Sequence, residues 1–428
     1  MKQHNLELTL SKDGLPLTFA ERQIIIEQNL ATDSCANNIN IPLEIKGKLD
    51  IPLLEQSLTE LVNRHTAFRS YYTMENGEFR HRIMEKLQVS LLQHSCNLDE
   101  VDSLIKTLDT PYNLSNAPLF RFNLFNVDAE HSILHLAFHH IIMDATSAAV
   151  MFDELWRLYR GEKLSPVKFD YPDYAVLQSQ NLDEDAGKEF FTQMFFDGIP
   201  MPILNRPEMP ILFRRPDVLP IADVNCECII DAVPIDEAAK RFGVSTFKLL
   251  FSAVGLTLAK YCGSEEVVVG CAMNGRPTAQ SFGIIGMFVN ILPILIKVHP
   301  EVQVSEYIKN VSQLISETKK HQTYPFEKIV SMFAPDRDAS RYPLFDIVVN
   351  YLTEIPIPDV SGLSIRMIPN KRQALGIDLK LEMQRVDDKL LLILSYSREL
   401  YQDEIISNMM EQLTTIISRL VALHHCHS

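Results

Sequence analysis

The hydrophobic pattern changes abruptly between residues 132 and 158, and this change constrains the fold more than any other feature of the chain. Residues 132–138 form a nearly continuous apolar run, which is typical of a buried strand. Thr146 or Ser147 is well placed to cap the first turn of a following helix. Apolar side chains then recur at helical spacing at Ala148, Met151, Phe152, Leu155 and Leu158. The pattern predicts a strand that leads through a short turn into an amphipathic helix.

Two histidines and an aspartate lie at this turn: His139, His140 and Asp144. Neighbouring strand residues point to opposite faces, so one histidine can face a shared cavity while the other is satisfied inside the fold. We assign the functional role to His140. The opposed directions argue against a metal ion held by both rings, and we expect no metal site. A hydrogen-bonded core histidine is the alternative that this motif alone leaves open.

Length and composition limit the class of protein. A chain of 428 residues is long for a single hydrophobic core and predicts two lobes of about 200 residues each. The N-terminus has no hydrophobic signal region, and no apolar run approaches the roughly 20 residues that span a bilayer. Seven scattered cysteines form no zinc-type pairs, so we expect reduced thiols in a cytoplasmic protein. A net charge of −15 disfavours nucleic acid, which is bound through basic patches.

Periodicity predicts mixed helices and strands in both halves of the chain. Residues 161–220 are rich in proline and are interpreted as a connector that contains a short helix over residues 183–196. Pro293 is expected to interrupt the strand over residues 288–298. The other expected helices cover residues 53–62, 244–261, 304–321 and 403–423, and the other expected strands cover residues 120–124, 266–271 and 345–351.

Further motifs accompany the histidine pair in a fixed order along the chain. They are residues 17–23 (Leu-Thr-Phe-Ala-Glu-Arg-Gln), 64–69 (Arg-His-Thr-Ala-Phe-Arg), 171–175 (Tyr-Pro-Asp-Tyr-Ala), 274–277 (Asn-Gly-Arg-Pro) with 285–290 (Ile-Gly-Met-Phe-Val-Asn), 321–327 (His-Gln-Thr-Tyr-Pro-Phe-Glu) and 337–345 (Arg-Asp-Ala-Ser-Arg-Tyr-Pro-Leu-Phe). Together with residues 139–144 they resemble the motifs of the condensation domains of non-ribosomal peptide synthetases. The resemblance covers almost the whole chain. Two departures are Glu21, where the family usually has Gln, and Ala145, where its His-His-x-x-x-Asp-Gly motif has Gly.

The resemblance implies an α/β fold. It implies two lobes like chloramphenicol acetyltransferase, which form a V with a substrate tunnel between them. We expect residues 1–175 to form the N-terminal lobe, which carries the histidine motif, and residues 176–428 to form the C-terminal lobe.

The resemblance also implies an amide-forming acyltransferase. Its donor is an acyl or peptidyl thioester on the 4′-phosphopantetheine of a separate carrier protein, its acceptor is a free or carrier-bound amine, and the chain itself binds no cofactor. The family's carrier proteins are typically acidic, so a chain with a charge of −15 needs local basic or apolar contacts for docking. We expect neither nucleic acid nor membrane as a partner.

Site residues follow from the matching motifs. His140, with His139 and Asp144, is expected to form the catalytic motif. Asp144 is expected to be structural, either in an ion pair with an arginine or as the cap of the following helix. The candidate arginines are Arg64, Arg69 and Arg276, of which we prefer Arg276; the candidate tunnel-lining residues are Ala145, Ser147 and Asn290. Asn290 has a second interpretation as a turn former at the end of a strand.

Several functions remain open at this point. The first motif lies close to Met1 and no carrier domain follows the last helix, so we expect a terminal enzyme that releases its product onto a free amine. An N-terminal acylating domain of a larger synthetase is the near alternative. Ala145 gives some support to a catalytically degenerate module that only binds a carrier. An ester-forming or epimerising relative would keep the fold and change the reaction.

Overall fold

The structure, a computed structural model, describes residues 14–30, 33–180, 184–200, 222, 224–334, 341–368 and 377–423. The chain forms two compact units. Unit 1 comprises Met1–Leu182, Thr278–Phe288 and Ile355–Asn370, and unit 2 comprises Asp183–Pro277, Val289–Glu354 and Lys371–Ser428. The units therefore differ from two continuous halves divided after residue 175, because two segments of the second half of the chain pack into unit 1.

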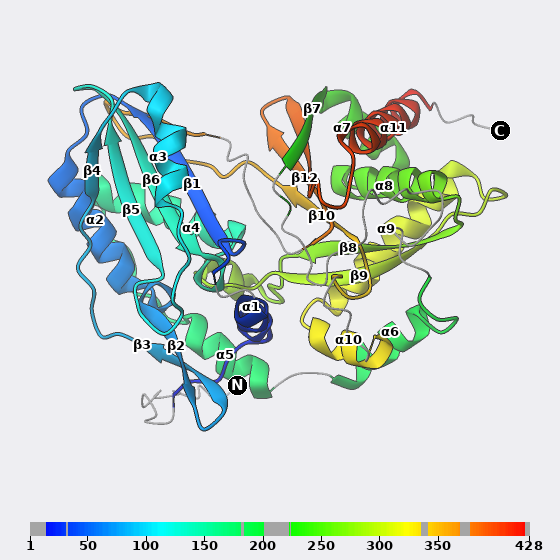
Figure 1. Ribbon diagram of the computed structural model, residues 1–428, viewed down its shortest axis with the longest axis horizontal. Helices are drawn as coiled ribbons and strands as arrows, with labels where there is room; N and C mark the ends of the chain where they lie inside the picture. The colour runs from blue at the N-terminus through cyan, green and yellow to red at the C-terminus, as the bar shows by residue number, and fades with distance from the viewer. Residues whose placement is uncertain are drawn as a thin grey trace. The chain divides into compact units, whose positions relative to one another are not determined.

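Unit 1 is built on a five-stranded sheet in the order β11-β1-β6-β5-β4 (Figure 1). Its central strand β6 runs antiparallel to both β1 and β5, and it delivers the histidine pair at its C-terminal end. The strand bounds are β1 Asn38–Lys46, β4 Leu92–Ser95, β5 Phe120–Asn126, β6 His131–His139 and β11 Ser364–Met367. Burial of Ile133, Leu134, Leu136 and Phe138 confirms the predicted buried strand.

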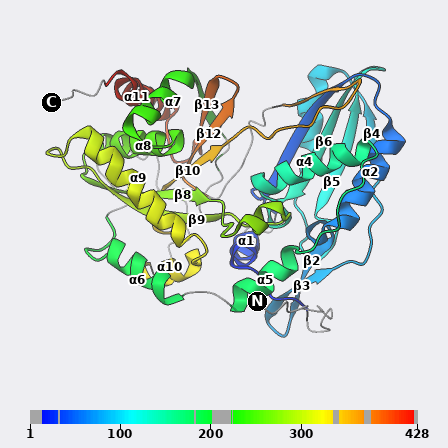
Figure 2. The ribbon, with the colours of Figure 1, turned by 180° about the vertical axis from the view of Figure 1, so that it is seen from behind.

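Helices cover both faces of this sheet. The helices α2 (Ile51–Arg64) and α4 (Ala145–Tyr159) pack side by side on one face (Figure 2). The helix α3 (Val101–Leu108) follows η2 (Leu98–Glu100) and clusters Val101 with Phe125 and Ile133 on the other face. All five apolar residues predicted for the inner stripe of α4 are buried, which confirms that stripe.

The remaining elements of unit 1 gather near the end of β6. They are α1 (Phe19–Leu30), η1 (Thr66–Arg69), the hairpin β2 (Ser70–Glu75) and β3 (Glu78–Ile83), η3 (His140–Ile142), α5 (Tyr171–Gln180) and η5 (Ala279–Gly283). Among these, α1 contacts η3, α5 contacts η1, and η5 contacts α4. Four of the motifs found in the sequence, residues 17–23, 64–69, 139–144 and 171–175, therefore contribute to these contacts within unit 1.

Unit 2 holds a six-stranded sheet in the order β7-β13-β12-β10-β8-β9. One hydrophobic core joins this sheet to its helices. The strands are β7 Val224–Asp231, β8 Glu266–Met273, β9 Asn290–Lys297, β10 Ile347–Leu352, β12 Leu379–Val386 and β13 Lys389–Tyr396, and the helices are α6 Glu184–Met194, α7 Val233–Phe242, α8 Thr246–Cys262, α9 Val304–Lys320, α10 Phe326–Phe333 and α11 Asp403–Ala422.

Two local predictions were wrong. Pro293 does not interrupt its strand: it lies inside β9 opposite Gly270, and β9 is an edge strand, where the missing N–H of proline is tolerated. The cap of α4 is Asp144, not Thr146 or Ser147, so the helix begins earlier than predicted. Residues 201–221 of the connector, and residues 335–340 of the last motif, lie outside the described residues.

Among the described residues, no single helix has both the length and the apolar character needed to cross a membrane. The pair α7 and α8, which is bent by 90°, meets both conditions only when the two helices are taken together.

Candidate active site at the end of strand β6

The two histidines have different environments. His139 is the last residue of β6 and is 1% exposed. Its Nδ1 accepts a hydrogen bond from the backbone N–H of Ile141 at 3.2 Å, and its Nε2 lies 3.2 Å from Oε1 of Gln28. Burial, with a smaller contribution from His140, lowers the pKa of His139 to about 3. His139 is thus a neutral core residue with both ring nitrogens engaged, whereas His140 begins η3 and keeps part of its surface accessible.

Asp144 joins the start of α4 to a distant loop of unit 1. Its Oδ1 accepts the N–H of Ser147 at 2.7 Å, which caps the helix, and its Oδ2 accepts the N–H of Phe288 at 3.1 Å. The carboxylate is 1% exposed. The capping alternative for Asp144 is confirmed, and the residue also fixes the loop against the helix.

Three consecutive residues of that loop are held by hydrogen bonds. The hydroxyl of Ser147 donates to the carbonyl of Gly286 at 2.7 Å and accepts its N–H at 3.0 Å. The hydroxyl of Tyr171 donates to the carbonyl of Met287 at 2.5 Å, and Phe288 bonds to Asp144. A Cβ on Gly286 would lie 2.2 Å from Cδ2 of Tyr171, so the close approach requires glycine. We call residues 286–288 the pinned segment.

Two of the predicted arginines, Arg64 and Arg69, bind different partners within unit 1. Arg64 donates to both carboxylate oxygens of Glu154 on α4, at 2.8 and 3.2 Å, and His65 lies 2.6 Å from the same carboxylate. Burial raises the pKa of Glu154, but the hydrogen bonds from His65 and Arg64 outweigh burial and leave this pKa below its ordinary value. Arg69 donates to the carbonyls of Met84 and Glu85. Arg64 therefore supports the helix that Asp144 caps, through a different carboxylate.

Two predicted residues belong to unit 2. Arg276 is 2% exposed, and its carbonyl accepts a weak hydrogen bond from Nε2 of Gln322 at 3.5 Å. The amide of Asn290, at the start of β9, donates to the carbonyls of Gln322 and Tyr324 at 2.9 and 2.8 Å. Within unit 2, Arg276 and Asn290 therefore both contact the motif over residues 321–327, and Asn290 fixes the loop that precedes α10.

Ala145 is the first residue of α4 and is exposed. It is not among the described residues with a positive φ. The backbone at this position is helical, so no left-handed conformation demands the glycine that the family motif has there.

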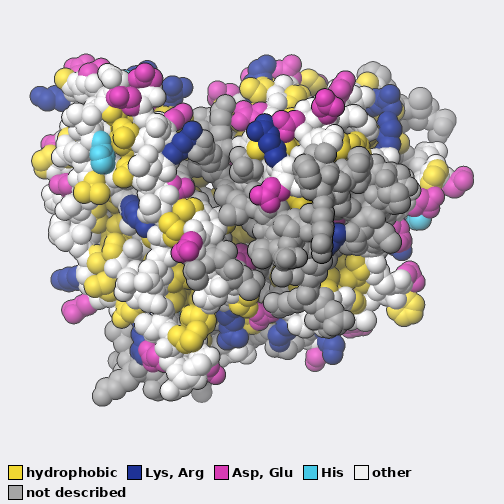
Figure 3. Space-filling model, viewed as in Figure 1, with side chains coloured by type: hydrophobic (Ala, Val, Ile, Leu, Met, Phe, Trp, Pro, Cys, Tyr) yellow, Lys and Arg dark blue, Asp and Glu magenta, His cyan; other side chains and the backbone are white. Residues whose placement is uncertain are grey.

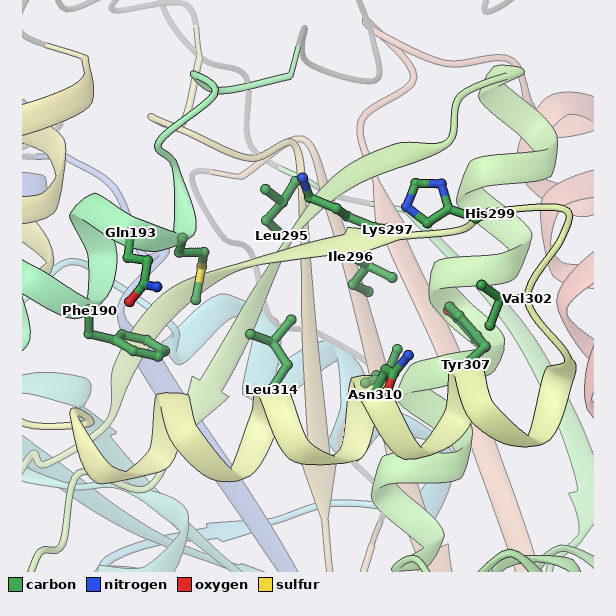
Figure 4. Close-up of a pocket in the computed structure, with 12 residues that line it drawn as sticks. Phe190, Gln193, Leu295, Ile296, Lys297, His299, Val302, Tyr307, Asn310 and Leu314 are labelled. Atoms are coloured by element: carbon green, nitrogen blue, oxygen red, sulfur yellow. The ribbon is translucent and has the colours of Figure 1, made fainter.

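A separate hollow of about 460 Å³ lies in unit 2, between α6, β9 and α9 (Figure 4). Apolar side chains dominate its lining, among them Phe190, Leu295 and Leu314, and Lys297 and His299 lie at its rim. None of the predicted site residues lines it, so we do not assign the reaction to this hollow.

Sequence reasoning missed three supporting residues: Gln28, Glu154 and Tyr171. Each contacts its site partner across a large separation in sequence, such as 111 residues between Gln28 and His139. Tyr171 belongs to the motif over residues 171–175, so this motif could have indicated a role for Tyr171 in the site. Gln28 and Glu154 lie in regular helices, where no local pattern distinguishes them.

Comparison with known proteins gives a family match over residues 11–428 to the model described as Condensation domain. Tyrocidine synthase 3 of Brevibacillus parabrevis is 30% identical over 415 residues, which are 95% of this chain and 6% of that protein. Surfactin synthase subunit 1 of Bacillus subtilis (strain 168) is 28% identical over 430 residues, 97% of this chain and 12% of that protein. The chain thus spans only a small part of these relatives.

Solved structures show the same fold at low identity. The X-domain from teicoplanin biosynthesis superposes with a TM-score of 0.82 at 18% identity, and covers 96% of both chains. The first condensation domain of the calcium-dependent antibiotic synthetase, in complex with a substrate analogue, gives a TM-score of 0.80 at 19% identity, and covers 95% of this chain and 96% of that one.

Proposed function

Because the chain belongs to the condensation-domain family, the amide-forming acyltransferases of non-ribosomal peptide synthesis, we propose that it joins a carrier-bound acyl or peptidyl thioester to an amine at His140. The observation that carries the assignment to His140 is the contrast between the two histidines. His139 is buried, with both ring nitrogens engaged, while His140 is partly accessible on the same rigid turn.

Amide formation from a thioester needs few catalytic groups. The amine nitrogen attacks the thioester carbonyl, the C–S bond breaks, the thiolate leaves on the pantetheine arm, and one proton is lost from the nitrogen. Three roles fit a histidine here: base, hydrogen-bond partner of the amine, or stabiliser of the oxyanion. Alignment of the two substrates lowers the barrier by itself, by up to about 7–11 kcal/mol. Some activity can therefore survive the loss of His140.

The role of Asp144 in this proposal is to position His140. Its cap on α4 and its bond to Phe288 hold the turn that carries His140. The tunnel between two lobes arranged as a V is also part of the proposal and rests on the family resemblance. Within it, Ala145, Ser147 and Asn290 are the residues that we propose near the substrates, with Arg276 as support.

The proposed partner is a carrier protein loaded through 4′-phosphopantetheine. Acidic and basic side chains are interspersed on the described face in Figure 3, and the whole chain carries a net charge of −15. Docking of an acidic carrier would then depend on local contacts and not on the overall charge. We propose terminal release onto a free amine as the first version of the reaction, with transfer to a carrier-bound amine as the alternative.

To test this proposal, the protein is incubated with acyl-loaded carrier, and the amide product is detected by mass spectrometry. The acceptor is a free amine in one arm and an aminoacyl carrier in the other. We expect His140→Ala to reduce kcat/KM by about 10²–10⁴-fold. His140→Gln keeps a hydrogen-bonding group without a base, so residual activity of this variant separates positioning from proton transfer. His131→Ala, at the other end of β6, is the matched control. Equal product from wild type and His140→Ala would refute the catalytic assignment.

A further inference from the structure

A buried polar cluster lies beneath the start of α1, close to the pinned segment. Glu21 and His81 are both 0% exposed. Oε2 of Glu21 accepts the N–H of Thr18 at 2.7 Å, and Oε1 accepts the hydroxyl of Tyr72 at 2.7 Å. His81 stacks on Tyr72, with ring centroids 5.1 Å apart. A carboxyl group in such a place has no solvent to stabilise its charge.

The hydrogen bonds around His81 determine where its proton lies. The hydroxyl of Ser70 donates to the carbonyl of Thr66 at 3.0 Å, so its oxygen accepts from Nε2 of His81 at 2.6 Å. A neutral imidazole with its proton on Nε2 has an acceptor at Nδ1. This Nδ1 is buried without a hydrogen bond from any described residue, and Oε1 of Glu21 lies 3.4 Å from it. If Glu21 were ionised, two acceptors would face each other in a dry site.

We propose that Glu21 is an un-ionised carboxylic acid whose proton on Oε1 faces Nδ1 of His81, and that this proton makes Glu21 a positioning residue for the site at His140. Burial raises the pKa of Glu21 to about 7 and lowers the pKa of His81 to about 3, in agreement with two neutral groups below about pH 7. The other groups that face Glu21 are Arg22, the phenol of Tyr72 and the phenol of Tyr171. Of these, only Arg22 is charged at neutral pH, and it favours ionisation weakly.

A chain of hydrogen bonds links Glu21 to the active site. The carboxyl group of Glu21 binds the N–H of Thr18, and the hydroxyl of Thr18 lies 2.9 Å from that of Tyr171. Because the hydroxyl of Tyr171 donates to Met287, it accepts from Thr18. Tyr171 thereby holds Met287 of the pinned segment, and the following residue, Phe288, donates its N–H to Asp144. Ionisation of Glu21 would push the start of α1 away from β3 and disturb Thr18, Tyr171 and the segment in turn.

A comparison of Glu with Gln at position 21 shows what the proton contributes. A Gln amide can accept the N–H of Thr18 with its oxygen and donate to Nδ1 of His81 with its nitrogen. Glu21 can do both only when it is protonated. Glu21 therefore offers a donor that is lost as the pH rises. Glu21→Gln provides a permanent donor with nearly the same shape.

The first test compares rates of amide formation by wild type and Glu21→Gln as a function of pH. Ionisation of the substrate amine cancels in the ratio of the two rates. We expect a constant ratio in acid and a rise to about tenfold in favour of Glu21→Gln one pH unit above the ionisation of Glu21. Glu27→Gln is the matched control on α1: burial also raises the pKa of Glu27 to about 7, and its Oε1 accepts a hydrogen bond from Nε2 of Gln23 at 3.1 Å. A flat ratio for Glu21→Gln, or the same rise for Glu27→Gln, would overturn the positioning role.

The second test needs no activity and so is independent of the proposed function, on which the first test rests. Carbon-13 NMR of the glutamate carboxyl groups should show two resonances that ionise near pH 7, one absent in Glu21→Gln and the other absent in Glu27→Gln. Nitrogen-15 shifts of His81 should report a neutral ring with the proton on Nε2. An ordinary carboxyl titration for Glu21, or a doubly protonated His81, would overturn the assignment of the proton.

Discussion

Substitution of Asp144 tests whether its two hydrogen bonds organise the active site. Asp144→Ala removes the cap of α4, at a cost of about 1 kcal/mol, and leaves the buried N–H of Phe288 without this acceptor, at a further cost of about 1–3 kcal/mol. The expected loss in the free energy of unfolding is about 2–4 kcal/mol. Asp144→Asn presents one oxygen to two donors on opposite sides, so we expect an intermediate loss.

The assay is chemical denaturation of each variant, with amide formation measured in parallel. Thr146→Ala is the matched control, because Thr146 is a good capping residue by sequence but does not cap α4; it should cost less than about 0.5 kcal/mol. Ser147→Ala should weaken the attachment of the pinned segment. The double variant Asp144→Asn with Ser147→Ala should lose less unfolding free energy than the sum of the two single losses, because both residues bind residues 286–288. Wild-type stability in Asp144→Asn would refute the dual role.

Three further predictions concern the surrounding residues. Gly286→Ala should cost about 1–3 kcal/mol of stability by collision with Tyr171, while Gly283→Ala, with open space around it, should be nearly neutral; thermal unfolding compares them. Because the pKa of Glu154 is lowered on folding, Glu154 contributes to the free energy of unfolding above its ordinary pKa of 4.5, and this contribution is lost as the pH falls through the folded value. Glu154→Gln should therefore lose less stability in acid than wild type does, and an equal loss in both proteins would contradict this. Ala145→Val should keep the fold and slow bulky amines more than small ones, and equal slowing of all amines would place the residue away from the acceptor route.

Local sequence patterns predicted most elements because each is decided by neighbours in the chain. The apolar stripe of α4 and the tail helix α11 follow from residues three and four positions apart. The sequence left the cap of α4 open among Asp144, Thr146 and Ser147, because all three are good caps and only the backbone angles decide among them. Pro293 was misinterpreted because the sequence does not say which strand lies at the edge of a sheet.

The candidate site was predictable where a motif named its residues and unpredictable where tertiary packing chose the partner. His139, His140 and Asp144 were found together, but the partner of Arg64 was not, since Glu154 lies 90 residues away on α4. The protonation of Glu21 depends on complete burial and on the ring of His81, which only the folded chain brings within 3.4 Å. The sequence showed Glu21 only as a departure from a motif.

The closing of the unit 1 sheet by β11 has a consequence for synthesis of the protein. Strand β1 pairs with β6 on one side and with β11, far along the chain, on the other. At roughly 5–20 residues per second, about 10–40 s separate Leu182 from the last segment of unit 1 on the ribosome. During that interval the nascent chain has an open β1 edge, and open edges recruit other strands. The unit whose translation begins first therefore stays incomplete until most of unit 2 has been made, and a fragment that ends at Leu182 should aggregate where the full chain does not.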